Sequence, residues 1–276
     1  LEVGYVSEIY DDEAARVMGL HEGHVTAIIH SGSRGFGYQV CDDALQDMDK
    51  AMNKYNLELP DRQLACTPID SPEGQKYIRG MRCAINYAFA NRQVMAHNTR
   101  LAFEEALDVT PREHGLHTVY EVAHNIAKFE THRVNGREQE VCVHRKGATR
   151  ALPAGHPLVP ARYQHVGQPV LIPGDMGRYS YVLVGTEKAM DETFGSTCHG
   201  AGRKMSRRQA RKTAGNRNVT AELAHEGIIV RGESRRTVTE EISEAYKDVA
   251  DVVEAVEGAG LSKKVARLRP LGVIKG

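Results

Sequence analysis

The stretch SPEGQKYIRGMRCAINYAFANRQVMAHNTRLAFEEAL, from Ser71 to Leu107, decides more about the expected fold than any other segment. Ser71 followed by Pro72 is a typical helix start, because serine can cap a helix and proline suits its first turn. The helical pattern continues to about Leu107, which corresponds to roughly 50 Å at 1.5 Å per residue. Gly80 is the weakest point, since glycine lowers helix stability. We therefore expect one long helix.

Shorter patterns on either side predict strands and further helices. Phe36 to about Tyr55 has apolar residues at helical spacing, and Glu241 to Glu257 is expected to form an amphipathic helix that carries Tyr246. Short apolar, β-branched runs predict strands at Val25–His30, Thr118–Ala123, Glu140–His144, Val170–Ile172, Tyr181–Val184 and Ile228–Val230. Because long helices are inserted between clusters of strands, the expected fold class is α+β.

The composition indicates a globular protein with a substantial core. A chain of 276 residues with 41% hydrophobic content can form one large domain or two packed ones, and we expect residues 1–276 to form a single domain. The 36 basic and 36 acidic side chains cancel, so the overall charge indicates no partner. The chain begins at Leu1-Glu2-Val3, which resembles the middle of a strand, and we expect an N-terminal part to be missing.

The cysteine pattern and the hydropathy predict a cytoplasmic protein. The five cysteines include no C-x-x-C pair, which argues against a disulfide framework and favours a reducing compartment. No apolar stretch approaches the length of a membrane span, and the first residues lack the pattern of a signal peptide. We therefore expect no membrane partner.

A second stretch, FGSTCHGAGRKMSRRQARK from Phe194 to Lys212, indicates a phosphate-binding turn. Its centre is His199-Gly200-Ala201-Gly202-Arg203. Glycines let the backbone approach a phosphate closely, and a following helix directs free N–H groups toward an anion. The guanidinium of Arg203 offers two parallel donors to phosphate oxygens.

Positive charge is concentrated directly after this turn. Fifteen residues contain no Asp or Glu and seven cations: Arg203, Lys204, Arg207, Arg208, Arg211, Lys212 and Arg217. If one helix carries them, Arg203, Arg207 and Arg211 form one stripe. Like charges at this spacing repel by a few tenths of a kcal/mol per pair, which favours a polyanion opposite them. The alternative is a solvated helix, and the residues alone leave both interpretations open.

Three of the thirteen histidines stand out by their context. His30 ends an expected strand, His124 follows another, and His199 lies in the glycine-rich turn. Neutral imidazole is a common ligand of borderline divalent metals, and strand ends often present such ligands. A histidine that faces a phosphate can be a spectator, a general acid or a nucleophile. Spacing does not choose among these roles.

Five blocks of sequence, in this order, resemble the RtcB family of RNA-splicing ligases. They are HSGSRGFG (30–37), AHNIAKFE (123–130), VHRKGATRA (143–151), IPGDMGRYSYVLVG (172–185) and CHGAGRKMSRR (198–208). The last four residues, Val273 to Gly276, also resemble the C-terminus of the family. The resemblance therefore extends over essentially the whole chain.

The resemblance implies a reaction and its partners. RtcB ligases join RNA with a 2',3'-cyclic phosphate or a 3'-phosphate to RNA with a 5'-hydroxyl, using GTP and manganese. His199 is then expected to attack the α-phosphate of GTP and to carry the guanylate. The resemblance also implies an activating protein partner and a central metal and nucleotide cleft.

The resemblance assigns roles to further residues. His30 and His124 are expected to bind one Mn²⁺ ion. Contacts to the guanine nucleotide are expected from Glu2, Ser180, Tyr246, Lys275, Gly200, Ala201, Gly202 and Arg203. Contacts to RNA or phosphate are expected from Arg34, Lys146 and Arg207. Asp175 receives no role, because a carboxylate there would repel phosphates unless a metal or an arginine screens it.

The upstream aspartate, cysteine and Asn-His ligands of the family have no counterpart in these 276 residues. We therefore expect the isolated chain to be inactive as a ligase. Two other functions stay open: a metal-dependent RNA phosphodiesterase that uses His199 as a proton donor, and a non-catalytic RNA-binding module that uses only the cationic segment.

Overall fold

The computed structural model describes residues 1–61 and 64–275 and divides the chain into two compact units. The first unit contains Leu1–Ile28 and Thr118–Gly276, and the second contains Ile29–His117. Gly276, the last residue of the expected C-terminal resemblance, lies outside the described residues. The expectation of a single domain over residues 1–276 stays a prediction, since two compact units can belong to one domain.

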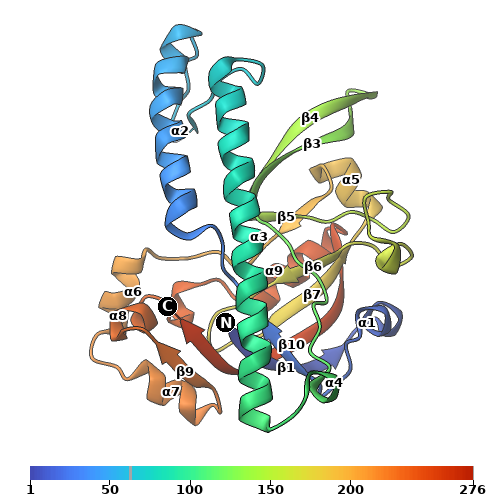
Figure 1. Cartoon of the computed structure of the whole chain (residues 1–276), viewed down its shortest axis with the longest axis vertical. Coiled ribbons are helices and arrows are strands. Elements are labelled where there is room, and N and C mark those ends of the chain that lie inside the picture. The colour runs from blue at the N-terminus through green and yellow to red at the C-terminus, as the bar shows by residue number, and fades with distance from the viewer. Residues whose placement is uncertain (62–63, 276) are drawn as a thin grey trace. The chain divides into compact units, whose positions relative to one another are not determined.

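A mixed sheet forms the centre of the first unit, with the strand order β2-β1-β10-β7-β6 and with β9 parallel to β10 (Figure 1). The other pairings are antiparallel. Its strands are β1 (Glu2–Ile9), β2 (Val25–Ile28), β6 (Pro169–Ile172), β7 (Ser180–Gly185), β9 (Ile229–Gly232) and β10 (Ser262–Lys275). This mixture of strand directions, together with the helices, confirms the α+β class.

Two small sheets and several short helices complete the first unit. The small sheets are the hairpin β3 (Asn125–Val134) with β4 (Arg137–Lys146), and the pair β5 (Ala148–Arg150) with β8 (Ser196–Cys198). The helices are α1 (Asp12–Met18), α5 (Glu187–Thr193), α6 (Arg207–Ala214), α7 (Val219–His225), α8 (Arg235–Thr239) and α9 (Val249–Gly258), with 3-10 turns at Ala161–Tyr163 and Ser243–Ala245.

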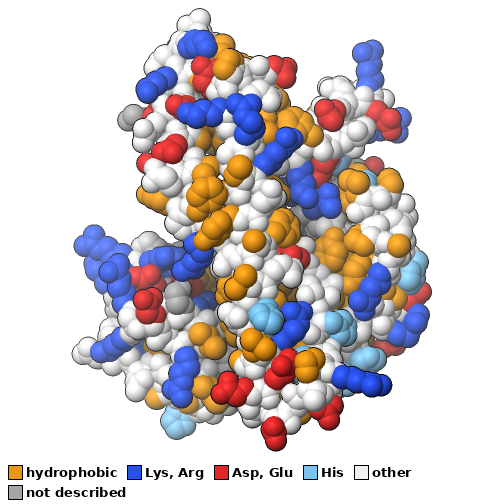
Figure 2. Space-filling model, viewed as in Figure 1, with side chains coloured by type: hydrophobic (Ala, Val, Ile, Leu, Met, Phe, Trp, Pro, Cys, Tyr) orange, Lys and Arg blue, Asp and Glu red, His pale blue; other side chains and the backbone are white. Residues whose placement is uncertain are grey.

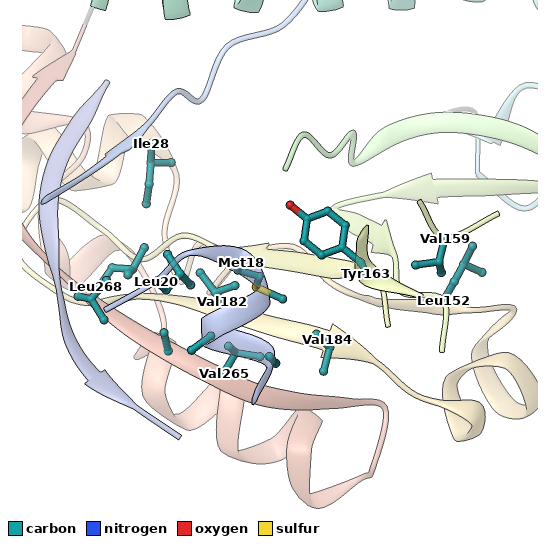
Figure 3. Packing of buried hydrophobic residues seen from close by; sticks show 14 residues of the cluster. Met18, Leu20, Ile28, Leu152, Val159, Tyr163, Val182, Val184, Val265 and Leu268 are labelled. Atoms are coloured by element: carbon teal, nitrogen blue, oxygen red, sulfur yellow. The ribbon is translucent and has the colours of Figure 1, made fainter. Parts of the chain in front are cut away.

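Helices cover both faces of β7, which explains why its four central residues, Tyr181 to Val184, are apolar. Val182 and Val184 pack in the cluster that contains Met18 of α1 (Figure 3). Tyr181 and Leu183, which alternate with them, pack in the cluster that contains Val253 of α9. Successive side chains of a strand point to opposite faces, so a strand covered on both sides is apolar along most of its length.

The second unit is a helical hairpin of α2 (Arg34–Lys54) and α3 (Pro72–Leu107), followed by the short α4 (Pro111–His114). The Ser71 hydroxyl accepts a hydrogen bond from the Gly74 N–H at 3.0 Å, as expected for a helix cap. α3 continues through Gly80, where an added Cβ would lie 3.1 Å from a methyl group of Val40 in α2. The glycine therefore permits close packing of the two helices.

The expected strand at Thr118–Ala123 is wrong. These residues form no strand, and the ladder begins only at Asn125 in β3. Val119 and Tyr120 instead pack against the core of the first unit, and the Val119 carbonyl accepts a hydrogen bond from the Tyr163 hydroxyl. The apolar pattern therefore reflects side-chain packing of an extended segment without a partner strand.

The expected helix from Glu241 to Glu257 is also wrong in its first half. A 3-10 turn at Ser243–Ala245 comes first, and Tyr246 is extended, forming a β-bridge with Arg203. α9 starts only at Val249, where the Asp248 side chain accepts a hydrogen bond from the Ala250 N–H. An aspartate at this position favours a helix start, which the apolar periodicity concealed.

No helix within residues 1–61 and 64–275 is both long and apolar enough to cross a membrane. The cytoplasmic location stays a prediction.

Gly185, at the end of β7, permits a close approach of two chain segments. An added Cβ would lie 2.2 Å from the carbonyl carbon of Ala151 and 2.5 Å from the Leu152 oxygen. We predict that Gly185→Ala lowers the free energy of unfolding by about 1–3 kcal/mol, because the backbone itself must move. Gly258→Ala is the control, since no described atom outside its own helix and chain neighbours lies within 4 Å of its added Cβ. Urea denaturation measures both, and equal stability of the two variants would contradict the prediction.

Candidate active site

Two of the three singled-out histidines lie against each other in the first unit. The rings of His124 and His199 are stacked, with centroids 3.5 Å apart and planes inclined by 6°. One ring nitrogen of His124 lies within 4.8 Å of one ring nitrogen of His199. Two imidazolium charges at this distance would repel by roughly 5 kcal/mol at an effective dielectric constant of about 20, so the stack favours at least one neutral ring.

The backbone of Gly147 holds both histidines. Its N–H donates to the His124 carbonyl at 2.9 Å, and its carbonyl accepts from the His199 N–H at 3.2 Å. Gly147 has φ +65°, a conformation that glycine adopts without a steric cost. It lies between β4 and β5, and the next residue, Ala148, pairs with Cys198. Gly147 therefore links the backbones that carry the two rings.

A buried ion pair connects the chain segments that lead to Gly147 and to His199. Arg145, two residues before Gly147, donates to both carboxylate oxygens of Glu130, at 3.0 and 2.8 Å. The same guanidinium donates to the Phe194 carbonyl and to the Ser196 hydroxyl, each at 2.8 Å, just before His199. Burial raises the pKa of Glu130, but the hydrogen bonds and charge of Arg145 outweigh it and lower the pKa of this carboxyl. Arg145 thus joins β4 to β8.

A second group of expected residues lies along the central sheet. The Ser180 hydroxyl of β7 donates to the Glu2 carboxylate of β1 at 3.2 Å. Burial raises the pKa of Glu2 to about 7, although the hydrogen bond from Ser180 and the charge of Lys275 act in the opposite direction. Glu2 pairs with Val273 of β10, two residues before Lys275. The sheet therefore brings together Glu2, Ser180 and Lys275.

Asp175 joins this group, although the sequence assigned it no role. It is buried, accepts a hydrogen bond from the Ser243 hydroxyl at 2.5 Å and another from the Gly177 N–H at 2.9 Å. Nε of Arg178 lies 3.6 Å from its carboxylate. Arg178 thus supplies the screening that the sequence analysis required for a carboxylate at this position. Through Ser243, Asp175 also connects the loop before β7 to the 3-10 turn at Ser243–Ala245.

Arg203 and Tyr246 form the third group. The Arg203 guanidinium donates to the Tyr246 hydroxyl at 2.6 Å and lies 4.7 Å from the centroid of its ring. Glu241 accepts from both side chains, and Nζ of Lys275 is 4.0 Å from its carboxylate. Burial and the hydrogen bond to Glu241 raise the pKa of Tyr246, so its hydroxyl stays protonated at neutral pH.

The glycine-rich turn connects the stacked histidines to this third group. Ala201 is buried in the α9 cluster, and Gly202 has φ +69°. The Gly202 carbonyl then accepts from the Lys247 N–H at 3.1 Å, next to the Arg203–Tyr246 bridge. The turn is therefore anchored at both ends, with Gly200 between His199 and the buried alanine.

The expected cationic helix needs a correction. α6 begins at Arg207 because Ser206 caps it, so Arg203 precedes the helix and cannot share a stripe with Arg207 and Arg211. Those two arginines face Glu240, with Nη1 of Arg207 at 3.9 Å and Arg211 in closer contact. A carboxylate of the same chain therefore supplies much of the negative charge opposite the stripe.

Three expected residues remain: Lys146 in the first unit, and His30 and Arg34 in the second. Lys146 is exposed at the end of β4. His30 and Arg34 belong to the second unit, where His30 follows β2 by two residues and Arg34 begins α2. Sequence reasoning missed Glu241 and Gly147. Gly147 stood inside a block that resembled the family, whereas nothing local distinguished Glu241 from other surface glutamates.

Comparison with known proteins decides the family. The family model described as tRNA-splicing ligase RtcB matches residues 1–276. The chain belongs to the RtcB family. A relative from Archaeoglobus fulgidus, named tRNA-splicing ligase RtcB, is 55% identical over 276 residues, which are 100% of this chain and 57% of the relative.

Two further RtcB relatives with the same printed name come from Methanocaldococcus jannaschii and Thermococcus kodakarensis. Both are 52% identical over the whole chain, which covers 28% of the first and 57% of the second. The chain thus spans little more than half the length of the A. fulgidus and T. kodakarensis relatives.

We predict that Arg145→Ala lowers the free energy of unfolding by about 3–5 kcal/mol, because it leaves the buried Glu130 carboxylate without its main partner. Arg133→Ala is the matched control: Arg133 is exposed on the same hairpin, and its loss is expected to cost less than about 0.5 kcal/mol. Chemical denaturation measures both changes. Similar losses for the two variants would show that the Arg145 ion pair has no special importance.

We predict that Glu2→Gln changes the pH dependence of stability. With the pKa of Glu2 near 7 in the fold and 4.5 as the ordinary value, the folded state keeps a proton that the unfolded state loses between these pH values. The stability of the natural chain therefore falls as pH rises through this window, by at most about 1.4 kcal/mol per pH unit.

In the Glu2→Gln variant this contribution is absent, so its stability relative to the natural chain should rise from pH 4.5 to 7. Denaturation at several pH values measures the difference. Glu138→Gln, at an exposed position of β4, should show no such trend. A difference between the Glu2 variant and the natural chain that stays constant with pH would contradict this assignment.

Proposed function

We propose that the chain is the nucleotidyl-transfer part of an RNA ligase that joins 2',3'-cyclic phosphate or 3'-phosphate ends to 5'-hydroxyl ends. The observation that carries the proposal is the His124–His199 stack at the start of a glycine-rich turn that leads to Arg203 and Tyr246. Membership of the RtcB family and the names of the relatives support the same reaction.

In this proposal His199 is the nucleophile. A ring nitrogen attacks the α-phosphorus of GTP, a P–N bond forms, and pyrophosphate leaves with the electrons of the broken P–O bond. The guanylate then passes to the RNA 3'-phosphate, and the 5'-hydroxyl displaces GMP. The hydrogen bond from the His199 backbone N–H to the Gly147 carbonyl fixes the backbone that carries the ring, which limits the reorganisation needed before the attack.

The donor set fits a divalent metal ion. The stack favours at least one neutral ring, and neutral imidazole nitrogen is a common ligand of borderline divalent metals. We propose that His124 and His30 bind one Mn²⁺ ion; His30 is tethered within two residues of β2. Such an ion would neutralise charge that develops on the phosphate oxygens.

Guanine recognition is assigned to Glu2, Ser180, Tyr246 and Lys275. A carboxylate such as that of Glu2 can accept the N–H groups on the Watson–Crick edge of guanine, whereas adenine lacks the exocyclic N2 donor. The Glu2–Ser180 hydrogen bond orients the acceptor. We propose that these residues and the histidines line one central cleft.

Phosphate contacts are assigned to the turn Gly200–Gly202 and to Arg203, with Lys146, Arg207 and Arg34 for RNA. Arg203 is held by Tyr246 and Glu241, which fixes its guanidinium before a ligand binds. Arg207 shares Glu240 with Arg211, so its contribution to RNA binding should be smaller than the sequence suggested. An activating protein partner stays a prediction.

We predict that a chimera, in which these 276 residues replace the matching part of the A. fulgidus relative, forms a covalent guanylate adduct with labelled GTP and Mn²⁺. The same chimera with His199→Ala should form none, and this chain alone should form little. Acid lability of the label identifies a phosphoramidate. The matched control is His144→Ala, since His144 is exposed on β4 and should leave the adduct unchanged.

Label transfer that persists in the His199→Ala chimera would overturn the assignment of the nucleophile. Cleavage of RNA without GTP and without an adduct would instead identify the phosphodiesterase. Salt-sensitive RNA binding as the only activity would identify the non-catalytic module.

A further inference from the structure

A groove in the first unit lies between α7, β9 and α8. It has a volume of about 550 Å³, within the range of about 300–1,000 Å³ of ligand sites. Val219, Val230 and Val238 form an apolar floor, and each is less than 9% exposed. Polar side chains surround this floor, among them Asn218 and Ser234.

The charge of the groove is positive. Of the residues that the structure describes, three arginines and no Asp or Glu line it: Arg217, Arg231 and Arg235. Arg217 is neutralised by Glu222 at 2.6 Å and Glu244 at 2.5 Å. Among the described residues, neither Arg231 nor Arg235 has a carboxylate within 4.0 Å, and Arg235 donates only to the Gly215 carbonyl at 3.4 Å.

The groove adjoins the residues assigned to the nucleotide. Arg231 and Gly232 of β9 pair with Ile274 and Lys275 of β10. The Glu233 N–H also donates to the Lys275 carbonyl at 3.0 Å. On the other side, Lys and Arg side chains gather over α6 and α8 (Figure 2). A negatively charged chain that leaves the nucleotide site along β9 would therefore enter this groove.

We propose that this groove binds the sugar-phosphate backbone of single-stranded RNA at a distance from the end that reacts. The choice of RNA rests on the proposed ligase function. Arg231 and Arg235 contact phosphates, Asn218 and Ser234 contact sugars or base edges, and the valine floor contacts a ribose or base face. A strand suits the groove better than a single phosphate, because the two arginines lie on different elements, β9 and α8.

The test measures RNA binding without chemistry. A fluorescent single-stranded RNA with 5'-phosphate and 3'-hydroxyl ends is titrated with the chain in the absence of GTP and metal, at several salt concentrations. The double variant Arg231→Gln/Arg235→Gln should bind more weakly, and the slope of log K against log salt should fall by about 1.4, since each contact to a single strand contributes about 0.7.

Two control variants distinguish the effect of the groove residues from the effect of the net charge. Arg133→Gln/Arg137→Gln removes the same charge from the exposed β3–β4 hairpin and should bind RNA as the natural chain does. Arg231→Lys/Arg235→Lys keeps the charge and should keep the salt slope. Equal weakening by the groove and hairpin variants, or unchanged binding by the groove variant, would overturn the proposal.

Competition with inorganic phosphate at constant ionic strength tests whether the groove is only a small-anion site. Displacement of the RNA by millimolar phosphate would identify a small-anion site and also overturn the proposal. This RNA-binding measurement is independent of the guanylate adduct. A chain that forms no adduct but still binds RNA in the groove would refute the ligase assignment and leave the groove proposal standing.

Discussion

β10 forms backbone hydrogen bonds along both edges, and the positions of the site residues depend on this pairing. On one edge it pairs with β1, which carries Glu2, and on the other with β7, which carries Ser180. Its last residues pair in parallel with β9 and include Lys275. Because successive strands of a sheet lie about 4.8 Å apart, residues distant in the sequence are held within reach of one ligand. The register of β10 thus determines which side chains meet.

Most charged side chains near the candidate site are paired with an opposite charge of the same chain. Arg145 is paired with Glu130, Arg203 with Glu241, and Asp175 is screened by Arg178. Each pair costs desolvation, and in return each guanidinium is held in one orientation. Such fixed groups can stabilise charge on a phosphate without rearranging when it binds.

Local signals in the sequence were enough for the long helices and for β2, β6, β7 and β9, but they did not predict β10. Ser71-Pro72 gave the start of α3, and the apolar runs gave β6, β7 and most of β9. The start of α6 at Arg207 and of α9 at Val249 depended on Ser206 and Asp248, single capping residues inside a longer periodic pattern. At the site, the glycine-rich turn was recognisable, whereas the partners Glu240 and Glu241 come from a distant segment that no spacing rule connects to it.

The two described ends of the chain are joined by backbone hydrogen bonds: the Ile274 N–H donates to the Leu1 carbonyl at 2.7 Å, and the Leu1 amino group donates to the Ile274 carbonyl at 3.0 Å. Contacts of such large sequence separation form late, because the intervening loop must close first. During synthesis on the ribosome, β1 has to wait for β10 to emerge. Glu2 of β1 and Lys275 of β10 therefore come together only once β10 has been translated, so a nascent chain lacks this part of the sheet until then.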